Sequence, residues 1–161
     1  MEENKEKTVK KRQECDPAYQ WHIQDLYASD EAWEKDYESL TSEIQSLAAY
    51  EGRLKEGSEV FVEYMRKKEA LMKKFEAIYV YANQRLHENT DNGTYQNLAS
   101  QAQGLLVELS ENLSFVEPEL MELPDGTIET FLNENEELSV YRQYFENIIR
   151  QKKHVLPTEQ E

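Results

Sequence analysis

Two apolar stripes separated by a polar turn decide the fold, and both lie in residues 58–113, which read SEVFVEYMRKKEALMKKFEAIYVYANQRLHENTDNGTYQNLASQAQGLLVELSENL. Each stripe recurs mostly every three or four residues, which is the period of one face of an α-helix. The first stripe is Phe61, Met65, Met72, Phe75, Tyr79, Ala82 and Leu86, widened by Leu71 and Ile78. The second is Tyr95, Leu98, Ala102, Leu105, Leu109 and Leu113. The Asn-Thr-Asp-Asn-Gly run at 89–93 is a dense turn signal, so we predict a long antiparallel helical hairpin.

Further helical patterns flank the hairpin on both sides. Ser29 is a typical N-cap with acidic residues after it, and the helix it begins is predicted to end before Gly52. The stripe of this helix is Trp33, Tyr37, Leu40, Ile44 and Leu47. After the hairpin, residues 115–124 carry two prolines and predict a break. Two shorter helices should follow, the first with Ile128, Phe131 and Leu132, the second with Leu138, Tyr141, Phe145, Ile148 and Ile149. We therefore expect an all-α bundle of about five helices.

The two ends of the chain have their own signals. Residues 1–14 are highly charged and lack aromatic side chains, which predicts a flexible leader, whereas residues 15–161 should form one helical lobe. Pro17 disfavours helix at the residue before it, so residues 15–27 are predicted to be an extended arm. Its expected apolar anchors are Trp21, Ile23, Leu26 and Tyr27.

The last four residues, 158–161, read Thr-Glu-Gln-Glu, which is a capping box that begins a helix. We therefore expect the chain to be truncated where a further helix would start.

The composition excludes several classes of partner. The 161 residues include 33 acidic and 18 basic side chains, a formal net charge of −15, which disfavours nucleic acid and anionic lipid surfaces. No apolar run is long enough for a transmembrane helix, and no secretory signal is recognised at the N-terminus. Cys15 is the single cysteine, so no intrachain disulfide can form, and a cytoplasmic location is expected.

No pattern in the sequence predicts a catalytic or metal-binding site. His87-Glu88 begins a His-Glu-x-x-His motif, but Asp91 stands where the second histidine is needed, at a predicted helix end. We interpret this stretch as a solvated helix terminus. The sequence also lacks a glycine-rich phosphate loop and a Gly-x-Ser-x-Gly elbow. We therefore predict no catalytic residue, no metal ligand and no cofactor in this chain.

Two tyrosine pairs are the candidate binding residues. Tyr79 and Tyr81 form one pair, and Tyr141 and Tyr144 form the other. On a helix, this spacing places one member of each pair in the core and the other at the edge. An edge tyrosine can line a groove for a peptide, although packing between helices is the more common role.

Four stretches together resemble a known family. They are Trp21 to Trp33 (WHIQDLYASDEAW), Tyr79 to Thr90 (YVYANQRLHENT), Phe115 to Leu120 (FVEPEL), and Tyr141 to Leu156. In this order and spacing, the sequence is similar to the N-terminal region of the oligoendopeptidase F group, within the M3 family of zinc metallopeptidases. The likeness extends over nearly the whole of residues 15–161.

The resemblance implies a helical N-terminal lobe that helps enclose a channel for short oligopeptides. In the full-length parent, Zn²⁺ would be held in a later lobe by a His-Glu-x-x-His motif and a downstream glutamate, which this sequence lacks. The expected partners are that missing catalytic lobe of the same polypeptide and short peptides. Tyr79, Tyr81, Tyr141 and Tyr144 are then candidates for the channel wall or the lobe interface. Two alternatives stay open: a free-standing helical interaction module, and a decayed peptidase remnant without activity.

Overall fold

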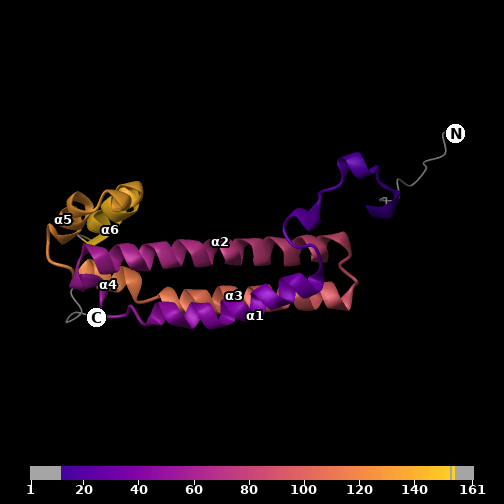
Figure 1. The fold of residues 1–161 in the computed structure, drawn as a ribbon, viewed down its shortest axis with the longest axis horizontal. Helices are drawn as coiled ribbons and strands as arrows, with labels where there is room; N and C mark the ends of the chain where they lie inside the picture. Colours follow the sequence, from indigo (N-terminus) through magenta and orange to yellow (C-terminus); the bar gives the residue numbers. More distant parts are fainter. Residues whose placement is uncertain (1–11, 153, 155–161) are drawn as a thin grey trace.

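A computed structural model describes residues 12–152 and 154, and its regular secondary structure within this part of the chain is helical. Three long helices lie lengthwise beside one another, and three short ones gather at the end of the bundle where the longest helix begins (Figure 1). The helices are α1 (Asp30–Ala48), α2 (Ser58–Glu88), α3 (Gly93–Leu113), α4 (Val116–Glu122), α5 (Thr127–Glu134) and α6 (Arg142–Lys152). The predicted all-α class is confirmed. None of the helices described is both long and apolar enough to cross a membrane.

The predicted helix starts are confirmed by their caps. The Ser29 hydroxyl accepts a hydrogen bond from the Ala32 amide at 3.3 Å at the start of α1. The Asn92 side chain accepts from the Thr94 amide at 2.9 Å at the start of α3. These side chains satisfy amides that have no partner within the helix. Since α2 and α3 are joined by a short turn and contact each other along their length, the predicted hairpin is confirmed.

The core lies where α1, α2 and α3 meet. Trp33 on α1 is 0% exposed, and its indole N–H donates a hydrogen bond to the Ile78 carbonyl at 2.9 Å. Its ring stacks on Tyr37 with centroids 5.2 Å apart. The N-terminal half of α2 is also covered by α5, so its buried surface is wider than one stripe. Val62 and Tyr64 are buried although they lie outside the predicted face, and the Tyr64 ring packs against Tyr50 and Phe115.

The predicted break at 115–124 is wrong over most of its length. Residues Val116–Glu122 form α4, which follows α3 after only two residues, so that α3 and α4 run on as one bent helix. Pro118 is the third residue of α4, a position whose backbone N–H has no intrahelical acceptor, so proline costs no hydrogen bond there. Counted with this bend, the bundle has the predicted five helical segments.

The beginning of the last predicted helix also differs from expectation. Residues Glu136–Tyr141 form a 3-10 helix, η5, and α6 begins only at Arg142. The Asn135 side chain accepts from the Glu137 amide at 3.1 Å and starts this tighter turn.

The N-terminal arm is not extended, which corrects the prediction for residues 15–27. It contains the short 3-10 helices Arg12–Glu14, Pro17–Tyr19 and Ile23–Asp25. Pro17 opens the second of these, where its fixed φ suits a helical turn, and the Asp16 carboxylate accepts from the Ala18 amide at 2.9 Å. Ile23 and Tyr27 are buried as expected, whereas Trp21 and Leu26 are exposed and do not anchor the arm to the bundle.

The loop between α1 and α2 is held by one carboxylate of α4. Glu119 accepts hydrogen bonds from the Gly52 amide at 2.8 Å and from the Leu54 amide at 2.6 Å. These two hydrogen bonds hold the α1–α2 loop against α4, and so join the long helices to the short ones. Residues 1–11 of the predicted 1–14 leader and the capping box at 158–161 lie outside the described residues.

Candidate functional site

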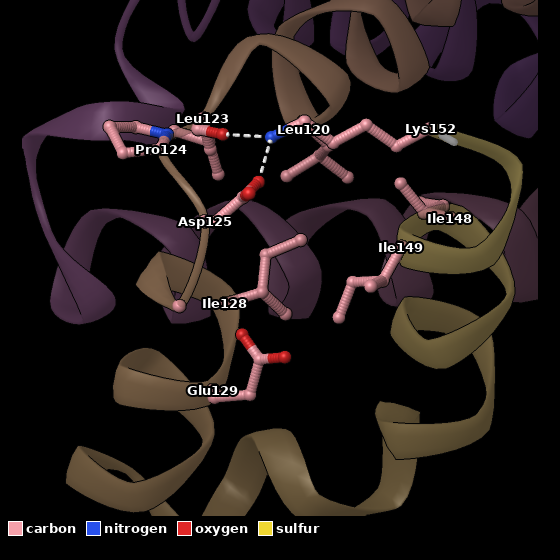
Figure 2. A pocket seen from close by; sticks show the side chains of 10 residues that line it. Leu120, Leu123, Pro124, Asp125, Ile128, Glu129, Ile148, Ile149 and Lys152 are labelled. Carbon is pink, nitrogen blue, oxygen red and sulfur yellow. Dashed lines mark hydrogen bonds and ion pairs between the residues drawn. The ribbon is translucent and has the colours of Figure 1, made fainter. Parts of the chain in front are cut away.

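An apolar cleft of about 360 Å³ lies between α4, α5 and α6. Its floor is made by aliphatic side chains of all three helices, which face one another in Figure 2. These side chains are Leu120, Leu123, Ile128, Ile148 and Ile149. The cleft has the composition of a surface that accepts an apolar side chain, because its polar groups are restricted to the rim.

Lys152 closes the rim of this cleft. Its Nζ donates to the Leu123 carbonyl at 2.6 Å and to the Asp125 carboxylate at 2.7 Å (Figure 2). Leu123 is the C-cap of α4, so the ammonium group satisfies a carbonyl at a helix end. The chain turns there at Gly126, whose φ of 85° is a left-handed conformation that favours glycine. Lys152 and Gly126 together fix the position of α5 against α6.

A second, shallower groove of about 240 Å³ lies between α2 and η5. Tyr141 lines it and donates its hydroxyl proton to Glu69 at 2.8 Å. Arg66 pairs with Glu137 across the groove, with Nε 2.8 Å from Oε2. Val140, at the groove edge, is 77% exposed. The groove therefore combines an exposed apolar side chain with fixed charges of both signs.

The charges of this groove are stabilised in their ionised forms. Hydrogen bonds from Lys73 and Tyr141 lower the pKa of Glu69, and the hydrogen bond from Arg66 lowers the pKa of Glu137. Both carboxylates thus stay negative at neutral pH and below.

The structure places the four candidate tyrosines in two separate regions. Tyr141 and Tyr144 lie beside the middle of α2, where Tyr141 reaches Glu69 and the Lys68 ammonium lies 5.4 Å from the Tyr144 ring centroid. Tyr81 lies 12 residues beyond Glu69 on α2, which is roughly 18 Å along a helix axis. The two pairs therefore do not form one site in this lobe.

The burial of the tyrosines follows the sequence expectation for one pair only. Tyr81 is 3% exposed, while Tyr79 is half-buried, as predicted. Tyr141 and Tyr144 are both half-buried, so the expected buried member is missing there. Contact of any of these tyrosines with a peptide or a second lobe stays a prediction.

A network of charged and aromatic side chains joins the start of α1 to the end of α2. Arg85 donates to Asp30 at 3.2 Å and to Glu88 at 2.9 Å, and its guanidinium carbon lies 4.2 Å from the Tyr95 ring centroid. The Tyr81 hydroxyl donates to Asp30 at 2.7 Å. Burial, and then this hydrogen bond, raise the pKa of Tyr81. Each charge in the network has a partner, so we interpret it as structural.

The described residues contain no group of three or more His, Cys, Asp and Glu side chains that could hold a metal ion. His22 is exposed and lies 2.6 Å from the Asp25 carboxylate. His87 is exposed in the last turn of α2, which confirms its predicted place at a solvated helix terminus.

Sequence reasoning missed both grooves, Lys152 at the rim of the cleft, and Arg85 in the network between α1 and α2. The i,i+3 spacing of Arg85 and Glu88 is a visible signal for an ion pair on one helix face. Lys152 and Asp125 are 27 residues apart, and no local pattern connects them.

Comparison with known proteins gives consistent similarities. The family model described as Oligopeptidase F matches residues 119–161, a range that contains all the residues lining the α4–α5–α6 cleft. Group B oligopeptidase PepB of Streptococcus agalactiae is 33% identical over 93% of this chain and 25% of the relative. Oligopeptidase PepF of Bacillus subtilis is 28% identical over 99% of this chain and 24% of the relative.

Two crystal structures share the fold. Oligoendopeptidase-F from Enterococcus faecium matches with a TM-score of 0.69 and 32% identity over 82% of this chain and 26% of that chain. A candidate peptidase from Chlamydophila abortus matches with a TM-score of 0.82 and 26% identity over 94% of this chain and 26% of that chain. The chain spans about a quarter of the length of the relatives that it matches.

Proposed function

Because the chain belongs to the oligoendopeptidase F group of M3 peptidases and matches its N-terminal region, we propose that it acts as a non-catalytic lobe of such a peptidase. In this role it forms part of the wall of a channel that admits short oligopeptides. Its task is to bind and align the peptide, while bond cleavage takes place in a lobe that this chain does not contain. The shared fold over 94% of the chain carries this proposal.

The sequence supports a non-catalytic role. It contains no His-Glu-x-x-His motif, and the described residues offer no cluster of metal ligands. The Zn²⁺ that the resemblance implies for the full-length parent therefore does not fit the residues described here, and no step of our proposal passes through a metal. The single cysteine is consistent with a reducing compartment, and we propose the cytoplasm.

The α2–η5 groove is the part of the lobe that we propose for peptide contact. Val140 offers an exposed apolar side chain, and Tyr141 offers a half-buried ring whose hydroxyl is fixed by Glu69. A ring held in one rotamer loses little entropy when it covers a ligand. Glu137 and Glu69 are ion-paired with Arg66 and Lys73, so the groove offers a peptide fixed charges of both signs.

Two activity measurements test the lobe assignment. The purified chain is first incubated with Zn²⁺ and a fluorogenic oligopeptide, and we expect no cleavage above buffer. A chimera is then made in which residues 1–161 replace the matching quarter of Streptococcus agalactiae PepB, with the shortened PepB polypeptide as the control. We expect the chimera to cleave the peptide and the shortened polypeptide to be much less active.

The outcomes separate the parts of the proposal. Cleavage by the isolated chain would contradict the non-catalytic role. A chimera no more active than the shortened PepB would contradict the lobe assignment. A Tyr141→Ala chimera with unchanged KM would remove the groove from the proposal. Tyr79→Ala tests the other tyrosine pair separately, because Tyr79 lies outside the groove.

A further inference from the structure

We propose that the N-terminal arm, residues 12–27, is the surface through which this lobe docks onto the C-terminal portion of an oligoendopeptidase F-type peptidase. The rings of Tyr19 and Trp21 make the contact. This inference rests on the proposed function and identifies the interface that joins the two portions.

The arm is fixed on the side that precedes the two rings. The Arg12 guanidinium donates to the Trp21 carbonyl at 2.7 Å and lies 2.8 Å from a carboxylate oxygen of Glu88 at the end of α2. The Gln20 side-chain amide donates to the Arg12 carbonyl at 3.0 Å, which joins the backbone on the two sides of Tyr19. The backbone that carries both aromatic side chains is therefore tied to the bundle.

The arm is also fixed on the side that follows the rings. Ile23 is buried, and Tyr27 packs edge-on against Tyr81 with centroids 5.4 Å apart. The Tyr27 hydroxyl donates to Asp36 on α1 at 3.1 Å. Because both ends are held, the exposure of Tyr19 and Trp21 is a property of an ordered segment.

Apolar exposure is concentrated in this segment. Tyr19 is 87% exposed and Trp21 is 78% exposed. Six large apolar side chains are exposed among the described residues. Three of them, Tyr19, Trp21 and Leu26, lie in one eight-residue stretch of the arm. Aromatic residues of this kind bury about 150–250 Å² each when covered, against about 600–1,500 Å² for a whole interdomain interface. The two rings could thus supply a large part of such an interface.

The length of the relatives indicates what covers the rings. The chain matches only about a quarter of each relative, so most of those polypeptides has no counterpart here. The arm projects from the bundle at the end opposite α5 and α6 (Figure 1), and its two rings are largely exposed. An arm that is already ordered pays little additional entropy on docking. The occupant that we assign is therefore the C-terminal portion.

A photo-cross-linking experiment in the chimera with PepB tests this inference directly. Trp21 is replaced by p-benzoylphenylalanine, and Val107→p-benzoylphenylalanine on the exposed side of α3 serves as the control. We expect light to link position 21, but not position 107, to the PepB portion of the same polypeptide, as located by mass spectrometry. In parallel, Trp21→Ala should lower the melting temperature of the chimera by about 5 °C, while that of the isolated chain changes by less than about 1 °C.

Each other outcome overturns the inference. A link from position 21 to a second chimera molecule would assign the arm to self-association, and a link formed only with added peptide would assign it to substrate. The absence of any link in an active chimera would remove the docking surface but leave the proposed function intact. An inactive chimera would overturn the proposed function, and this inference with it.

Discussion

Replacing Tyr64 by phenylalanine should stabilise the lobe. Tyr64 is 0% exposed, and no described residue gives its hydroxyl a hydrogen-bond partner. A buried hydroxyl without a partner costs about 1–3 kcal/mol of stability. Removing the oxygen leaves a void of roughly 15 Å³, which costs about 0.4 kcal/mol. The free energy of unfolding should therefore rise by about 1–2 kcal/mol, and the Tm by about 2–8 °C for a chain of this length.

The same chemical change at two other buried tyrosines is the matched control. The Tyr81 hydroxyl donates to Asp30 at 2.7 Å, and the Tyr50 hydroxyl donates to Glu63 at 2.6 Å. Losing the hydrogen bond to Asp30 costs about 1.5–3 kcal/mol, so Tyr81→Phe should be destabilised. Tyr50→Phe should be destabilised less, because Glu63 is exposed and water can replace the lost donor. Thermal and urea unfolding followed by far-UV circular dichroism gives all three values. If Tyr64→Phe is destabilised as much as the controls, its hydroxyl has a partner in solution and our reasoning is refuted.

Three further predictions use the same unfolding assay. Arg85→Ala should cost about 1–3 kcal/mol, because it leaves Asp30 without its cation and Glu88 with Arg12 alone. Arg85→Lys should recover less than half of this loss, because an ammonium lacks the guanidinium fork, and full recovery would contradict the two-carboxylate contact. Glu119→Ala should lower the free energy of unfolding by about 1–3 kcal/mol, because it removes the acceptor of two loop amides. Glu119→Gln should lower it less, because an acceptor oxygen remains. Equal losses in the two variants would show that only the charge of Glu119 matters. Burial raises the pKa of Tyr64, so the folded state keeps a proton that the unfolded chain releases near pH 10. The stability that Tyr64 contributes by staying protonated is therefore complete below that pH and is lost as the pH rises further. An equally steep loss of stability in Tyr64→Phe would contradict this role of Tyr64.

Much of the bundle was predictable because its helices obey local rules. Ser29 caps α1 with its own hydroxyl, and the Asn89 to Gly93 turn separates two stripes of helical period. The prediction of a break at 115–124 is wrong over most of its length, because the two prolines in this stretch do not exclude a helix there. Only the position of Pro118 within the first turn decides whether it ends a helix or is tolerated near its start.

The candidate site was less predictable, because its contacts join residues far apart in the sequence. Tyr141 and Glu69 are 72 residues apart, and Tyr81 and Asp30 are 51 apart. Local spacing indicated that one of Tyr79 and Tyr81 would be buried, but it could not show that Tyr141 and Tyr144 lie beside a different part of α2. The exposure of Trp21 was missed because Trp21 lies outside any helical stripe, so no local period indicates whether its side chain is buried.

The two tryptophans of the chain occupy opposite environments, which makes the molecule its own fluorescent reporter. Trp33 is enclosed in the core beside Tyr37, so its emission should respond to unfolding of the bundle. Trp21 is exposed to solvent on the arm. Its fluorescence emission, and the quenching of that emission by a small solute, should therefore change when another surface covers the arm. With Trp33→Phe and Trp21→Phe, the two signals can be read separately. Folding of the lobe and occupancy of its arm are thus two events that can be timed in one protein without an added label.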